Sequence, residues 1–427
     1  MENVTGDVLK KWLVELFPLN RSLTGTGVRQ TLDFLRKHLG EEFITHNIPS
    51  GTKAFDWIVP QEWQVNEAWI SDLEGNILIN FANNNLHLVG YSIKIDQIIS
   101  KDELDNHLHS IPELPDAIPY VTSYYKEEWG FCLTHNDRMK LGNGPFKVFI
   151  DSKHFDGFLN YGEFFVKGTS KDEVLLTTYI CHPSMASNEL SGPVIALALA
   201  KWLSQRRTKY SYRFLFSIET IGTIHYISQN LEKLKNQTKA GFVLTCLGDD
   251  RNYSYVPSRN GDTLSDRIAI KYLRDNIENY TEYTWLDRGS DERQLCSPGV
   301  DLPICSLMRS KYGEYPEYHT SLDNLDFVSE NSLFESFQMM KTVIEMIEEN
   351  EYYVLKNYCE PQLGVRGLYP NKSTRESGLS VRNLMNVISY LDGTRDLITI
   401  SELCKISFSE TLHIVNILRK HSLISVK

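Results

Sequence analysis

The chain has 427 residues, a formal net charge of −11 and seven cysteines without a CxxC pair. The length predicts two or three domains, and the acidic charge argues against non-specific binding to nucleic acid or to an anionic membrane. Scattered cysteines in an odd number argue against a disulfide framework or a thiolate zinc ribbon. The N-terminus lacks the pattern of a secretory signal, and no apolar run approaches the roughly 20 residues of a membrane span. We therefore expect a soluble cytoplasmic protein.

The chain opens with two segments of helical apolar spacing, residues 8–17 and 28–39. From residue 49 to residue 125 the sequence pattern changes to short runs in which apolar and polar residues alternate, such as "NILINFA" and "LHLVGYSI", and which are broken by Asn, Gly and Pro. This pattern is typical of a small antiparallel β domain.

Apolar β-type runs then alternate with helical segments. The runs span residues 173–180, 212–218, 241–247 and 302–307, and the helical segments that follow include 193–204, 263–274 and 331–348. Strands that are apolar on both faces and separated by helices predict a mostly parallel sheet that is covered on both sides. We expect a doubly wound α/β domain made of residues 1–48 and 126–358, with residues 49–125 as an inserted β domain.

Residues 360–376 are rich in Pro, Gly and charge and predict a linker. Beyond it, three short helical patterns and a final apolar run resemble a winged helix, which we assign to residues 359–427. Residues 361–427 carry nine Lys or Arg and five Asp or Glu, a mildly basic balance of +4. The expected recognition stretch, "SFSETLHIVNILRKHSL", has few basic residues and no clear base-reading pair. Packing or oligomerisation is therefore favoured over DNA binding for this domain.

Polar residues gather where the predicted parallel strands end, which is where open α/β sheets bind their ligands. Cys181-His182 and Glu219 each follow a strand, Asp249-Asp250 follow a third, and His319 lies in the loop "YPEYHTSLDNLDF". Histidine and carboxylate ligands from separate strand ends, with a further Glu to move a proton, are the layout of a catalytic zinc site.

In this order the blocks "ELSGP", "ETIGT", "SDERQ" and "YHTSLD" resemble the co-catalytic zinc aminopeptidases of clan MH, a group that includes the glutaminyl cyclases. The whole chain resembles a bacterial subgroup with an inserted β domain and a C-terminal winged helix. That subgroup carries long blocks that match "LFPLNRSLTGTGVRQTL", "PSGTKAFDWIVPQEW" and "CHPSMASNELSGP" here. The resemblance covers nearly all of the chain and implies a zinc peptidase-like fold.

Carried over position by position, the resemblance assigns His182 and His319 as metal ligands and Glu219 as the general base. The bridging Asp of the family falls on Asn188 and a ligand Glu falls on Thr220, and neither replaces a carboxylate well. We therefore expect a single Zn²⁺ rather than two, because a second dication with too few anionic ligands would leave charge uncompensated. Glu189 is the expected third ligand and Asp249 the reserve ligand.

Each assignment has a structural alternative. Glu189 also suits the first turn of a helix for electrostatic reasons, and Asp249 and Asp250 also suit loop caps. Three residues are candidates for substrate binding, namely Asp291, Arg309 and Tyr318. Arg309 would clamp a substrate carboxylate, although surface packing explains its aromatic surroundings equally well. For Arg21 and Ser22 the alternatives are a place at the mouth of the pocket and a turn between two helices, and the turn is favoured.

Three functions follow as hypotheses. The first is a zinc-dependent hydrolase that cleaves an amide bond in a small peptide or modified amino acid. The second is a degenerate peptidase-like ligand sensor that acts through the winged helix, and the loss of carboxylates at Asn188 and Thr220 favours it. The third is acyl transfer or cyclisation on the same fold. Homo-oligomerisation is open, and no membrane partner is expected.

Overall fold

The computed structural model describes residues 4–124, 126–368 and 375–427. The chain forms two compact units, one made of Met1–Ser265 and Thr281–Gln338 and the other of Asp266–Tyr280 and Met339–Lys427. Among the residues described, no helix is both long and apolar enough to cross a membrane.

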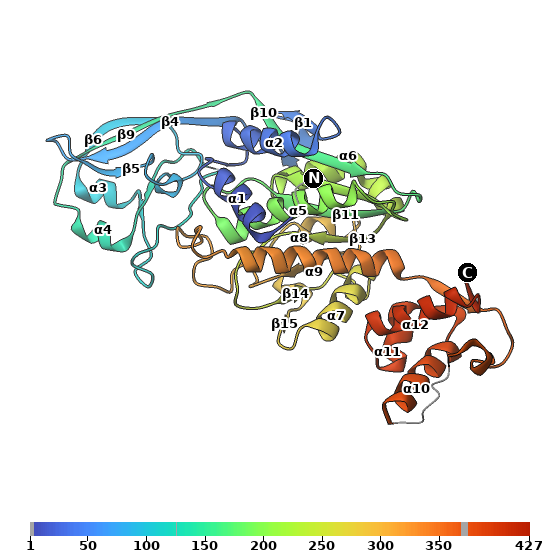
Figure 1. Ribbon diagram of the computed structural model, residues 1–427. Coiled ribbons are helices and arrows are strands. Elements are labelled where there is room, and N and C mark those ends of the chain that lie inside the picture. The colour runs from blue at the N-terminus through green and yellow to red at the C-terminus, as the bar shows by residue number, and fades with distance from the viewer. Residues whose placement is uncertain (1–3, 125, 369–374) are drawn as a thin grey trace. The chain divides into compact units, whose positions relative to one another are not determined.

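The first unit is built on a mixed sheet of eight strands in the described part of the chain (Figure 1). In spatial order they are β1 (Ile44–Pro49), β10 (Phe158–Val166), β12 (Ser211–Ser217), β11 (Glu173–Tyr179), β13 (Thr238–Val243), β16 (Ile304–Met308), β14 (Ser254–Val256) and β15 (Thr281–Glu282). The central four, β12, β11, β13 and β16, run parallel, whereas β1, β10 and β14 pair antiparallel to their inner neighbours. The predicted α/β class with a mostly parallel central sheet is confirmed.

The central strands are buried because helices cover them. Every residue of β11 and β12 is buried, as their continuous apolar runs predict. Helix α5 (Ser191–Leu203) packs against β11, while α1 (Gly6–Leu16) and α2 (Thr26–Leu39) pack against α5. Helix α6 (Ile221–Gln237) contacts β10 and β13, and α9 (Glu330–Glu349) begins in this unit.

A second, smaller sheet of the same unit carries strands in the order β5 (Ile77–Asn80), β4 (Glu62–Ser71), β9 (Phe146–Phe155) and β6 (Ile95–Ile99). The small sheet thus takes one strand from beyond residue 125, the expected end of the insertion. The hairpin β2–β3 (Lys53–Ala54, Trp57–Ile58), the parallel pair β7–β8 (Leu108–His109, Phe131–Cys132) and the short helices α3 (Lys101–Asp105) and α4 (His135–Lys140) accompany it. The domain boundaries themselves stay a prediction.

The second unit contains most of α7 (Leu264–Asn276) and three helices that pack on one another, α10 (Arg375–Ser389), α11 (Leu397–Cys404) and α12 (Phe408–Lys420). A small antiparallel sheet in the order β18 (Asp392–Asp396), β17 (Tyr352–Leu355) and β19 (Ile424–Val426) completes it. Three helices with a small sheet whose central strand is β17 and whose edge strands are β18 and β19 make the predicted winged helix, which is confirmed.

Candidate functional site

The site lies at the carboxyl ends of two adjacent parallel strands. β11 ends at Tyr179 and is followed by His182, whereas β12 ends at Ser217 and is followed by Glu219. The turn after Glu219 is tight, because Thr220 has a φ of +64° just before α6 begins. Parallel neighbours end at one edge of a sheet, so the two side chains emerge together.

Three side chains from distant parts of the chain meet at this edge. The Nε2 atom of His182 lies 3.6 Å from Oε2 of Glu219, and the ring centroids of His182 and His319 are 5.3 Å apart. His319 has a φ of +55°, an unusual conformation for a side chain of this size, and Tyr318 stacks on its ring at 3.9 Å. The structure therefore brings together the two predicted ligands and the predicted base.

Glu189 lies on the opposite side of the His182 ring from Glu219. Its Oε1 atom accepts a hydrogen bond from the backbone N–H of His182 at 2.9 Å, and its Oε2 atom lies 2.7 Å from Nδ1 of His182. A carboxylate only accepts, so Nδ1 carries a proton, and Nε2 is the nitrogen that faces Glu219 and the cavity. Glu189 is placed here by a turn of π-helix, Ala186–Leu190, that leads into α5. It supports and orients the imidazole.

Arg21 reaches this carboxylate from the turn between α1 and α2. Its guanidinium donates to the carbonyl oxygen of His182 at 3.0 Å and to that of Leu16 at 2.6 Å, and it lies 3.9 Å from Oε1 of Glu189. Burial lowers the pKa of Arg21 to about 10, and Glu189 opposes this change. The buried cation therefore balances the buried carboxylate, a role that the sequence analysis did not give to this turn.

The three converging side chains open into a cavity of about 370 Å³. Its lining combines aromatic, aliphatic and ionisable groups: Leu23, Trp57, Tyr120, Thr122, Tyr124, Cys181, His182, Glu219, Thr220, Ile221, Arg293 and His319. Burial raises the pKa of Glu219 to about 7 against the attraction of His182, and burial lowers the pKa of His319 to about 3. His319 is therefore a neutral imidazole, the form that binds a metal.

Asp291 holds the turn that carries Glu219 in place. Its carboxylate accepts hydrogen bonds from the backbone N–H of Thr220 at 2.8 Å and from Oγ1 of Thr223 at 2.7 Å. Burial raises its pKa to about 6, which these hydrogen bonds oppose. Arg293, two residues on, donates to Oγ1 of Thr220 at 3.0 Å and lines the cavity. Arg293 is therefore a basic residue of the cavity that the sequence analysis did not identify.

Three other predicted residues lie elsewhere or behind the cavity wall. Asp249 accepts hydrogen bonds from the backbone N–H and the hydroxyl of Ser310, at 3.0 and 2.7 Å, as a loop cap does. The guanidinium of Arg309 lies over the ring of Tyr253 at 4.1 Å and pairs with Glu335 at 3.1 Å. The cavity lining contains neither residue, and it does not contain Tyr318, which reaches the site only through His319.

The inserted segment before residue 125 supplies residues that sequence reasoning missed. The ring of Tyr120 lies 5.3 Å from that of His182 and 5.2 Å from that of His319, and its hydroxyl is 2.9 Å from that of Tyr124. The backbone N–H of Tyr120 donates to the carbonyl of His319 at 2.8 Å, which fixes the strained loop. Trp57 stands in the block "AFDW", which belongs to the family resemblance. No sequence pattern, however, predicts that a hairpin of the inserted segment lines this cavity.

The donors present fit one cation between His182 and Glu219. Two ligands at zinc distances of about 2.1 Å and a tetrahedral angle lie about 3.4 Å apart, close to the observed 3.6 Å. Among the described residues, the group whose ligand atoms all lie within 4.8 Å of one another is Cys181, His182 and Glu189, and it does not include His319. Those atoms already form hydrogen bonds with one another, however. Burial also raises the pKa of Cys181 to about 12, which keeps the thiol protonated and unsuited to a metal. The cavity side of His182 is therefore the better site.

Two family models match the chain. Residues 10–350 match the domain of unknown function DUF4910, and residues 350–426 match a winged helix-turn-helix. A Clostridium acetobutylicum protein, whose name proposes polysaccharide biosynthesis and an aminopeptidase-like domain, is 47% identical over 366 residues, 86% of this chain and 83% of that protein.

Solved structures extend the likeness to the fold. The crystal structure of a proposed peptidase from Clostridium acetobutylicum has a TM-score of 0.93 and 41% identity, covering 99% of this chain and 96% of that one. A zinc aminopeptidase from Bacillus subtilis has a TM-score of 0.58 at 12% identity, covering 80% of this chain and 95% of that one. The predicted aminopeptidase-like fold with a C-terminal winged helix is confirmed.

Proposed function

Because the chain belongs to the DUF4910 family of proteins with an aminopeptidase-like fold, we propose that it is a zinc-dependent hydrolase that cleaves an amide bond in a small substrate. The observation that carries this proposal is the convergence of His182, His319 and Glu219 on one cavity. Two histidines and one glutamate form a ligand set that catalytic zinc sites use, with a position left for water.

In this proposal Nε2 of His182, the ring of His319 and one carboxylate oxygen of Glu219 hold a single Zn²⁺. The bound ion would polarise the amide carbonyl and lower the pKa of water toward 7. Glu189 is not a metal ligand in this proposal. Its carboxylate accepts the hydrogen bond that keeps a proton on Nδ1 of His182, and Arg21 balances the charge of that carboxylate. This arrangement revises the third ligand that the sequence resemblance implies from Glu189 to Glu219, and it leaves Asp249 without a role in metal binding.

The chain's own residues then move the proton and position the substrate. The second oxygen of Glu219 would accept a proton from the attacking water and return it to the leaving amine, the role of a general base that is also a general acid. Asp291 holds the turn of Glu219 at the required place. Tyr120 packs on both histidines and keeps water from their outer faces.

Metal content and turnover test the proposal together. Purified protein should bind one equivalent of zinc and should hydrolyse a member of a panel of dipeptides, N-acyl amino acids and N-acyl amino sugars. The sugars belong in the panel because the relative's name proposes polysaccharide biosynthesis for that protein. Glu219→Gln should lose at least a hundredfold in kcat/KM. Turnover by Glu219→Gln at the wild-type rate would reject the mechanism.

A ligand sensor is the second candidate, because Asn188 and Thr220 occupy positions where the resembling peptidases carry ligand carboxylates. Asn188 is buried, and its Oδ1 atom has no hydrogen-bond partner among the described residues. A sensor would bind a small ligand without turnover and would retain a specific DNA or protein partner only in its presence. A cytoplasmic location and an oligomeric state stay predictions.

A further inference from the structure

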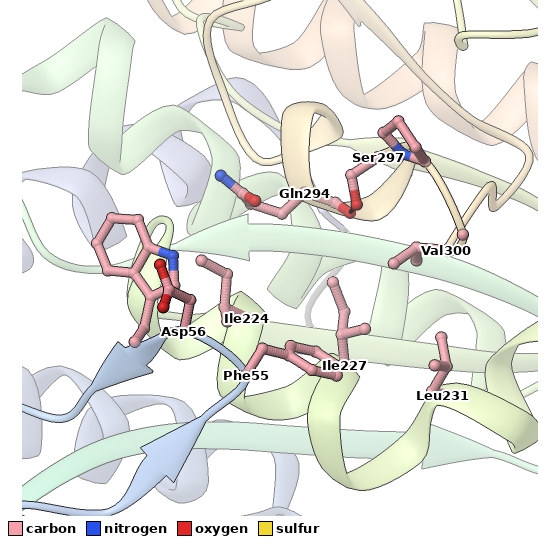
Figure 2. Close-up of a pocket in the computed structure, with 11 residues that line it drawn as sticks. Phe55, Asp56, Ile224, Ile227, Leu231, Gln294, Ser297 and Val300 are labelled. Atoms are coloured by element: carbon pink, nitrogen blue, oxygen red, sulfur yellow. Dashed lines mark hydrogen bonds between the residues drawn. The ribbon is translucent and has the colours of Figure 1, made fainter.

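A second cavity of about 380 Å³ shares Trp57 with the lining of the candidate site. Figure 2 shows the residues that line this second cavity. One wall is a face of α6 that presents Ile224, Ile227 and Leu231, and the opposite wall comes from the segment after α8 (Glu292–Leu295), with Ser297 and Val300. The tip of the β2–β3 hairpin closes one end with Phe55 and Trp57.

This apolar groove adjoins the candidate cavity. Trp57 lines both spaces. Helix α6 gives Ile221 to the catalytic cavity and Ile224, one turn later, to the groove, while α8 gives Arg293 to the first and Gln294 to the second. Three elements thus contribute neighbouring residues to both spaces. A ligand that occupies both spaces would extend past Trp57.

The hairpin tip keeps apolar surface exposed at some conformational cost. Phe55 is 60% exposed and has a φ of +53°, a conformation that a bulky side chain adopts rarely. Ile58, on the next strand of the hairpin, is 57% exposed. Exposed apolar side chains that adjoin a preformed apolar groove enlarge the surface available to an apolar ligand.

The groove and the candidate cavity differ in the charged residues that line them. The groove is lined by one ionisable residue, Asp56, whose carboxylate disfavours an anionic ligand, and otherwise by neutral side chains. The catalytic cavity contains Arg293, a cation able to bind a carboxylate. A molecule that satisfies both has an anionic head and a neutral apolar arm.

We propose that the groove binds the acyl chain of an N-acyl amino acid whose carboxylate faces Arg293 and whose amide lies at the candidate site. This proposal rests on the proposed function and names its substrate class. In the reaction water adds across the amide: the C–N bond breaks, a C–O bond forms, and the amine leaves with the proton that Glu219 delivers. The products are a fatty acid and a free amino acid.

Binding of a non-hydrolysed series tests the groove separately from catalysis. The probes are N-alkylsulfonyl-glycines from ethyl to octyl, measured by calorimetry on the zinc-loaded full chain. Each buried CH₂ should tighten Kd by about fourfold until the groove is full. Leu231→Gln should flatten this dependence, whereas Leu286→Gln, a change at an exposed leucine outside both cavities, should keep it.

Hydrolysis of the matching N-acyl-glycines is measured in parallel. Binding that tightens with the length of the alkyl chain, without any turnover, would support the groove and reject the hydrolase. Turnover whose rate does not depend on the length of the acyl chain would support the hydrolase and reject the groove. Absence of binding at every length, or the same chain dependence in Leu231→Gln as in wild type, would overturn the proposed groove.

Discussion

Both oxygens of Glu189 lie within 2.9 Å of nitrogen atoms of His182, which gives this residue a role that sequence alone did not assign. Sequence reasoning predicted His182 and Glu219 from their places after strands, and His319 from its polar loop and the family resemblance. It could not separate a ligand from the group that orients it, since the two carboxylates differ only in which side of an imidazole they occupy. It favoured a turn over a place at the pocket mouth for Arg21, and it missed Tyr120; both residues reach the site through tertiary contacts.

Glu189→Gln tests the orienting role. The amide would donate toward Nδ1 and shift the imidazole proton to Nε2, so zinc affinity should fall by about 10- to 100-fold. Competition titration with a zinc dye measures this change. Glu62→Gln is the matched control, because Glu62 is also buried but pairs with Arg29 away from the site. Equal zinc affinities in both variants and wild type would show that Glu189 does not orient the ligand.

Arg21→Met tests the charge balance. The change leaves the buried Glu189 carboxylate without its cation, and we expect a loss of about 3 kcal/mol in the free energy of unfolding. Arg259→Met removes a cation from a pair with Asp301 in which the two side chains are 43% and 44% exposed, and should cost under about 1 kcal/mol. Urea denaturation of both variants gives the comparison. A loss at Arg21 no larger than that at Arg259 would contradict the account.

At the scale of elements, the sequence predicted the central strands and their helices closely. The runs 173–180 and 212–218 correspond to β11 and β12, and the helical pattern 331–348 corresponds to α9. These elements are buried on both faces or strongly periodic, so composition alone reveals them. The edge strands were not predicted: β1 and β10 join the sheet antiparallel across a long sequence gap, and β14 and β15 are only three and two residues long.

Helix α11 of the winged helix begins at an N-cap whose charge matters to stability. Asp396 accepts from the backbone N–H of Thr399 and from both terminal nitrogens of Arg267, at 2.7 and 2.9 Å. Burial opposes its ionisation, but the hydrogen bonds from Arg267, Thr399 and Asn350 outweigh burial and lower the pKa of Asp396 to about 2. The side chain is only 4% exposed.

Acid unfolding of Asp396→Asn tests this cap. The unfolded pKa is about 3.9, so the stabilisation, about 2 kcal/mol, is complete above that pH and is lost as pH falls toward about 2. The variant should therefore be less stable than wild type at pH 7, and the difference should shrink below about pH 4. A difference that stays constant from pH 7 to pH 2.5 would contradict the predicted linkage.

The net charge of the whole molecule affects whether the winged helix can bind DNA. The net charge is −11, although residues 361–427 carry a small positive excess. Non-specific DNA binding depends on phosphate neutralisation, so 1 μM protein should not retain a mixed-sequence duplex in a gel-shift assay at 150 mM salt. Retention under these conditions, weakened as salt rises, would assign DNA binding to this domain and would favour the sensor.

Anomalous diffraction at the zinc edge, from crystals grown with one equivalent of zinc, tests the account most directly. We predict a single peak about 2.1 Å from Nε2 of His182 that also contacts His319 and Glu219, with Glu189 still bonded to Nδ1. Two peaks, a peak between Cys181 and Glu189, or no peak at this edge of the sheet would contradict the assigned centre.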